Sequence, residues 1–160
     1  MGIIVTRRRW IFFISTLAVL LITFIPALAQ QAEEKEPNNE PAQANVLPLN
    51  GEIRGYANDR EDIDWYQLVI PAPGIDILNI DISGIPGINL SLAFCDANGK
   101  ELSVMDARGD SEGEHLVRLR QPAGKFLIKV GTFGESNADQ PYVLRAGKPD
   151  RPPATDEEIR

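Results

Sequence analysis

The chain has 160 residues, of which 43% are hydrophobic, and a net charge of −7 at pH 7. This acidic balance argues against nucleic-acid binding, because phosphate backbones require a basic protein face. The single cysteine, Cys95, excludes an internal disulfide, so a chain of this size must be held by its core, with or without help from a metal ion.

Residues 1–29 predict an export signal. Arg7 to Arg9 supply positive charge, residues 10–25 are almost wholly apolar, and Ala27-Leu28-Ala29 fits the small-x-small pattern of signal-peptidase cleavage. The alternative is a retained membrane anchor, although the apolar run falls short of the ~20 residues that span a bilayer. Cleavage after Ala29 leaves 131 residues with 13 basic and 23 acidic side chains, a net charge of −10. We therefore expect a periplasmic or secreted protein that no longer contacts the membrane.

Residues 30–40 form an acidic leader without hydrophobic periodicity, which taken alone is typical of a flexible spacer. At the other end, residues 148–160 are rich in proline and charge, and we expect a disordered tail there. The structured domain is therefore expected to occupy residues 41–147.

Within that domain, short apolar runs alternate with turn residues. Period-two alternation is clearest around Tyr66, Leu68 and Ile70, which share one face of a strand, with Trp65 on the other face. Asn98-Gly99 is a strong hairpin signal, since both residues tolerate positive φ. Nine strands are expected, at residues 44–47, 52–56, 64–70, 75–83, 89–95, 100–105, 114–120, 125–132 and 142–146. Eight or nine short strands at this spacing, without an amphipathic helix, predict an all-β fold, an antiparallel β-sandwich.

Two acidic segments concentrate oxygen-bearing side chains. The first is Glu34-Lys35-Glu36-Pro37-Asn38-Asn39, and the second is Asp59-Arg60-Glu61-Asp62-Ile63-Asp64-Trp65-Tyr66. Calcium prefers six to eight oxygen ligands, which carboxylates and amide carbonyls supply. The alternative is a solvated acidic linker followed by an aspartate-rich turn that caps a strand.

The order of several motifs resembles the bacterial pre-peptidase C-terminal domain family. Glu36-Pro37-Asn38-Asn39 and Asp62-Ile63-Asp64-Trp65-Tyr66 are similar to its opening, and Leu90 to Gly99 is similar to its central hairpin. Pro122 to Val130 and Pro141 to Leu144 are similar to its last strands, so the likeness covers residues 34–146. The resemblance implies a jelly-roll-like β-sandwich that serves as an accessory module of secreted bacterial proteins, often beside peptidases.

Relatives of that family include the collagen-binding modules of secreted bacterial collagenases, in which an acidic N-terminal segment wraps a calcium site. The resemblance therefore implies calcium as a cofactor, with candidate ligands Glu34, Glu36, Asn38, Asn39, Asp59, Asp62 and Asp64. Because Asp64 begins a core strand, we favour a structural role for it. The leading candidates for calcium ligands are then Glu36, Asn38, Asp59 and Asp62. The chain has few aromatic residues, which argues against collagen binding.

The sequence offers no catalytic constellation. His115 is the only histidine, there is no Gly-x-Ser-x-Gly elbow, and one histidine with one cysteine does not make a zinc site. Asp62 and Asp64 can also be interpreted as a catalytic carboxylate pair, but we favour a structural interpretation of this pair. The protein is therefore not expected to be an enzyme.

Trp65 is a candidate ligand-binding residue, because an exposed indole can stack on a sugar ring or a proline. The alternative is that it packs under a loop or against the leader. The function predicted from the sequence is a non-catalytic exported module that binds a polypeptide, a polysaccharide or a partner protein. Two alternatives stay open: a structural spacer or solubility domain, and an inhibitor or chaperone-like partner of a separately encoded peptidase.

Overall fold

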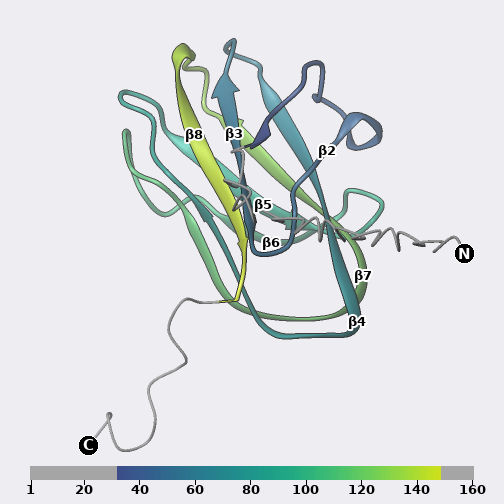
Figure 1. Cartoon of the computed structure of the whole chain (residues 1–160). Coiled ribbons are helices and arrows are strands. Elements are labelled where there is room, and N and C mark those ends of the chain that lie inside the picture. The colour runs from purple at the N-terminus through teal and green to yellow at the C-terminus, as the bar shows by residue number, and fades with distance from the viewer. Residues whose placement is uncertain (1–31, 149–160) are drawn as a thin grey trace, which may run out of the picture.

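A computed structural model describes residues 32–148. The predicted signal sequence at residues 1–29 and all but the first residue of the predicted tail therefore lie outside the described residues. Between these limits the chain is almost entirely β-structure, which confirms the predicted all-β class (Figure 1).

Eight strands and one short 3-10 helix make up the described chain. In order, they are β1 (Ala32–Glu33), η1 (Pro41–Gln43), β2 (Asn45–Val46), β3 (Gly51–Ala57), β4 (Ile63–Ile82), β5 (Leu90–Cys95), β6 (Glu101–Met105), β7 (His115–Thr132) and β8 (Asn137–Gly147). The predicted hairpin at Asn98-Gly99 is confirmed as the β5–β6 connection, where Gly99 has φ +84° and the Asp96 amide donates to the Lys100 carbonyl. A positive φ favours glycine at that position.

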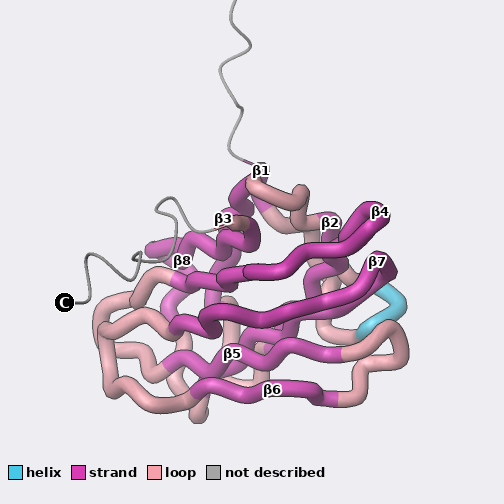
Figure 2. Tube along the Cα trace, turned by 90° about the horizontal axis from the view of Figure 1, so that it is seen from below, coloured by secondary structure: helices cyan, strands magenta, loops and turns pink. Residues whose placement is uncertain are grey.

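One hydrogen-bonded sheet folds over itself into two layers because β4 and β7 each belong to both. The strand order is β1-β3-β8-β4-β7-β5-β6, with β2 paired to β4 off this path. The first half of β4 pairs with the second half of β7, and β7 continues to β5 and β6. The second half of β4 pairs with β8, which pairs with β3 and so leads to β1. Figure 2 places β6 and β1 at opposite ends of this arrangement.

The core fills the space between the layers with the inward side chains of each strand. Tyr66, Leu68 and Ile70 are all at most 1% exposed, which confirms the face assigned to them from alternation. Inward residues of β5 and β7 pack against them. The largest of these side chains, Phe94 and Phe126, stack with ring centroids 5.1 Å apart. Burial of this continuous apolar surface is the main favourable contribution to folding.

The structure corrects three expectations about the strands. Residues 64–70 and 75–83 were expected as separate strands, as were 114–120 and 125–132, but each pair forms one long bent strand, β4 or β7. The turn-rich segments at Pro71–Gly74 and Pro122–Gly124 lie opposite one another, so the two strands bend together (Figure 1). The leader contains a strand, β1, and the short strands β1 and β2 pair in parallel, so the sandwich is not purely antiparallel.

A second, smaller hydrophobic cluster lies on the outer face of the β4, β5 and β7 layer. It consists of Trp65, Ala93, Cys95 and Leu127, with Ala44 and Ile63 packed against it. Trp65 is only 8% exposed, and a Cβ on Gly99 would lie 3.3 Å from Pro41 and 3.5 Å from Trp65. The indole is therefore packed beneath η1 and the hairpin loop. This agrees with the alternative predicted for Trp65, in which it packs under a loop or against the leader.

The position of Cys95 predicts an inert thiol. The residue is fully buried, and desolvation, followed by the nearby charge of Glu101, raises its pKa to about 11. Because the thiolate is the reactive species, we expect native protein to resist a thiol-specific reagent that labels the denatured chain at once. Labelling at equal rates in the two states would contradict this placement.

Candidate metal centre

The leader, described from residue 32 to residue 40, brings acidic side chains to one end of the sandwich and contacts both layers there. It leaves the β3 layer at β1 and joins the other layer at β2. Three contacts hold its path: the Glu34 amide donates to the Arg54 carbonyl, Asn45 exchanges hydrogen bonds with the Lys35 backbone, and the Trp65 amide donates to the Asn38 carbonyl. The segment predicted as a possible spacer is thus ordered against both layers.

Glu34, Glu36 and Asp64 form a carboxylate cluster. One oxygen from each lies within 4.8 Å of the others. Glu36 accepts hydrogen bonds from the Asn38 amide at 3.0 Å and the Asn58 side chain at 2.8 Å, while Glu34 accepts from the Tyr56 amide at 2.6 Å. These contacts aim the carboxylates of the leader toward Asp64 on β4.

Two buried tyrosines connect the carboxylates beneath the cluster. Tyr66 donates from its hydroxyl to Glu34, Tyr142 donates to Asp64, and the two hydroxyl oxygens lie 2.6 Å apart. This series of side chains has three hydrogen-bond contacts but only two hydroxyl protons to fill them. With both carboxylates ionised, one contact has no proton, so the arrangement favours a further proton on one of the carboxylates.

Burial makes the charges of this cluster costly. Asp64 is 3% exposed, and desolvation, followed by the charge of Glu34, raises its pKa to about 8. Desolvation likewise raises the pKa values of Glu34 and Asp62, and those of both tyrosine hydroxyls. Like charges in a low-dielectric site disfavour full ionisation unless a cation compensates them.

Two buried oxygen atoms beside the cluster accept no hydrogen bond from residues 32–148. They are Oδ1 of Asp64 and Oδ1 of Asn38, a residue whose side chain is fully buried. The Asn38 amide nitrogen donates to Glu34 at 3.3 Å, which places this side chain at the cluster. A buried acceptor without a partner is costly, and a bound water molecule or ion would satisfy it.

Other residues predicted as ligands occupy different positions. Asp62 is buried and accepts from the Asn58 amide at 2.6 Å, at the margin of the cluster, where the charge of Glu36 acts on it. Asp59 accepts from the Glu61 amide within its own turn and lines a separate surface hollow with Asn39, Arg60 and Glu61. The structure thus brings Asp64 into the cluster and leaves Asp59 and Asn39 outside it.

The tyrosine pair and Gly55 were not identified as site residues from the sequence. A Cβ on Gly55 would lie 2.3 Å from the Tyr66 hydroxyl and 2.4 Å from the Tyr142 ring. Only a glycine on β3 leaves room for both side chains. The sole sequence signal was Gly55 itself, a residue that weakens a strand interior and often marks a close approach.

No family model and no curated protein matches the chain. Among solved structures, it is similar to the 1.0 Å crystal structure of the pre-peptidase C-terminal domain of collagenase from Bacillus anthracis. The TM-score is 0.53 and the sequence identity 21%, over 68% of this chain and 99% of that chain. The chain has the fold of that pre-peptidase C-terminal domain. The resemblance inferred from the sequence motifs is thus confirmed at the level of the fold.

The pre-peptidase C-terminal fold occupies the part of the chain that the structure describes. In this fold the leader and the first half of β4 come together, which gives the acidic segments a common location. Over residues 32–148, we find no helix with the length and apolar character needed to cross a bilayer.

Proposed function

We propose that the protein is a non-catalytic accessory module, exported from the cytoplasm and stabilised by calcium bound at the carboxylate cluster. The observation that carries this proposal is the pair of buried, unpartnered oxygens of Asn38 and Asp64 beside three converging carboxylates. Together Glu34, Glu36, Asp64 and Asn38 would supply four oxygen ligands.

The donor set favours calcium over other common metals. All four donors are oxygen atoms, which suits hard cations, whereas zinc prefers histidine and cysteine. The set combines carboxylates with an amide oxygen and leaves positions for water, as calcium sites do. Because the ligands come from the leader and from β4, the ion would fasten the leader across the open end of the sandwich. In this proposal Asp64 is a ligand, contrary to the structural role favoured from the sequence.

Calcium is expected to raise the thermal midpoint of unfolding relative to protein in chelator. At about one hundred times Kd, a ligand of the native state adds about 2.7 kcal/mol, or roughly 10 °C for a domain of this size. Asp64→Asn is expected to abolish most of this shift, and Asp59→Asn, which removes an acid outside the cluster, to retain it. Equal melting curves in calcium and chelator would refute calcium binding, and loss of the shift in Asp59→Asn alone would relocate the site.

The accessory role is tested separately, by capture from secreted or periplasmic fractions of the source cells. The fold similarity to a domain of a collagenase supports a binding role beside a partner protein or a polymer. We expect the immobilised protein to retain a polypeptide, a polysaccharide or a peptidase. Retention of nothing, with or without calcium, would favour a spacer instead.

A further inference from the structure

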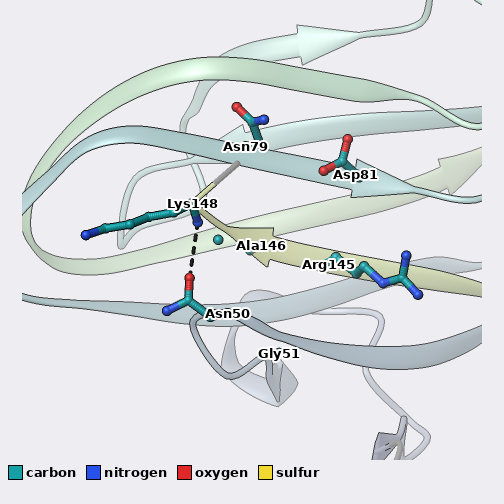
Figure 3. Close-up of a pocket in the computed structure, with 8 residues that line it drawn as sticks. Asn50, Gly51, Asn79, Asp81, Arg145, Ala146 and Lys148 are labelled. Carbon is teal, nitrogen blue, oxygen red and sulfur yellow. Dashed lines mark hydrogen bonds between the residues drawn. The ribbon is translucent and has the colours of Figure 1, made fainter. Parts of the chain in front are cut away.

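A second polar site, separate from the cluster, lies on the outer face of the β3, β8 and β4 layer. There a hollow of about 270 Å³ is lined by Asn50, Gly51, Asn79, Asp81, Arg145, Ala146, Gly147 and Lys148 (Figure 3). It lies where β8 ends, and it takes no part in the carboxylate cluster.

The register of the strands explains why the face is hollow here. Gly51, Ala146 and Ile80 lie side by side on β3, β8 and β4, and the Ala146 and Ile80 side chains point into the core. Their outer side is therefore backbone alone. In the next row Gly147 pairs with Asn79, and a Cβ on Gly147 would lie 2.8 Å from Asn50 Oδ1. Gly147 adds no side chain to that row, and the Asn50 side chain lies close against its backbone.

Polar side chains border this floor on both sides. On one side, Asp81 lies opposite Arg145 in the register, and each is fixed by a neighbour: Asp81 Oδ1 is 2.7 Å from His115 Nδ1, and Arg145 Nε donates to Glu52 at 2.7 Å. The row of Asp81 and Arg145 and the row of Asn79 and Gly147 are two residues apart along β8, or about 7 Å. The second oxygen of Asp81 remains as an acceptor facing outward.

On the other side, two asparagines use their oxygens within the protein. Asn50 Oδ1 accepts from the Lys148 amide at 3.1 Å, and Asn79 Oδ1 accepts from the Arg118 amide at 3.1 Å. Because the oxygens are engaged, the amide orientation is fixed and both NH₂ groups are left as donors. A ligand on the floor would therefore meet amide donors on one side and a carboxylate acceptor on the other.

We propose that this hollow binds a pyranose unit of a neutral polysaccharide, an inference that rests on the binding role proposed above and names its ligand class. A sugar ring carries hydroxyl groups around its rim, each able to donate and accept, which matches fixed donors and an acceptor across a flat floor. The floor has no apolar pocket that would hold a peptide side chain. The charges at the hollow are balanced, with Asp81 and Glu52 beside Arg145 and Lys148, and the net charge of the whole chain is −7, so an acidic polysaccharide is not favoured.

The test is a titration of ¹⁵N-labelled protein with tetrasaccharides of glucan, mannan and chitin, followed by amide chemical shifts. We expect at least one of them to shift the amides of Asn50, Gly51, Gly147 and Lys148 progressively, and a galacturonan tetrasaccharide to leave them unmoved. Asn79→Ala and Asp81→Asn should each weaken binding about fivefold, the effect of losing one hydrogen bond. Gln140→Ala, an exposed change elsewhere on β8, should bind as the unaltered protein does.

Melting curves of all variants establish that they are folded, and Asp81→Asn keeps the shape of the side chain should Asn79→Ala unfold. Three results would overturn the inference: no shifts with any neutral sugar, shifts confined to other residues, or binding unaffected by both substitutions. These outcomes are distinct from failure of the proposed function. Calcium-dependent melting does not involve the hollow, and capture of a protein partner without sugar binding would leave the accessory role standing.

Discussion

Gly55→Ala is expected to destabilise the protein by about 3 kcal/mol, the upper part of the range for overpacked cores. The added methyl group would lie 2.3 Å from the Tyr66 hydroxyl and 2.4 Å from Tyr142, both fully buried. Neither tyrosine can retreat without breaking its hydrogen bond to Glu34 or Asp64. Chemical denaturation of the variant and the unaltered protein measures the difference.

Gly109→Ala is the matched control for that substitution. No atom lies within 4 Å of a Cβ at Gly109, so we expect a change within about 0.5 kcal/mol. Similar stability for the two variants would contradict the close approach of β3 to the tyrosine pair. Because the tyrosines support the carboxylates, Gly55→Ala should also weaken the calcium response, and Gly109→Ala should preserve it.

Raising the pH is expected to destabilise the metal-free protein. The Asp64 carboxyl has a pKa of about 8 in the folded state against 3.8 as its ordinary value, so the native state holds the proton more tightly than the unfolded chain does. The resulting stability is complete below about pH 4 and is lost as the pH rises through about 8. Melting curves in chelator across this window measure the decline.

Calcium should reverse that trend, because the ion competes with the proton for the same carboxylates. The gap between the melting points in calcium and in chelator is therefore expected to widen as the pH rises toward 8. Asp64→Asn removes the titrating group and should flatten both the decline in chelator and the widening gap. A gap that stays constant with pH would contradict proton–metal competition at Asp64.

Much of the fold could be predicted from the sequence, because alternation in a half-buried strand is a local property. The faces of residues 66–70, 90–94 and 126–130 follow from period-two patterns, and the β5–β6 hairpin follows from Asn98-Gly99. The continuity of β4 and β7 could not be predicted in this way. Their proline and glycine segments were interpreted as turns, but paired opposite one another they form a shared bend instead.

The candidate site was only partly predictable, because its members are distant in the sequence. The leader acids could be identified from composition and resemblance, and Glu34 and Glu36 lie in the cluster. The arrival of Tyr142 from β8 beside Asp64 depends on the order of strands and on the missing side chain of Gly55. Local alternation gives no information on either. A structural role was predicted for Asp64 because it begins a core strand.

The parallel pairing of β1 with β3 bears on how the domain responds to mechanical force. A pull on the chain at Ala32 acts along β1, whose register with β3 covers only two residues, Ala32 and Glu33. The load then passes to Glu34, which is tied to Tyr56 on β3 and to Tyr66 on β4. The carboxylate cluster therefore transmits tension from the leader into both layers. An ion bound there would determine the force at which the leader detaches from the sandwich.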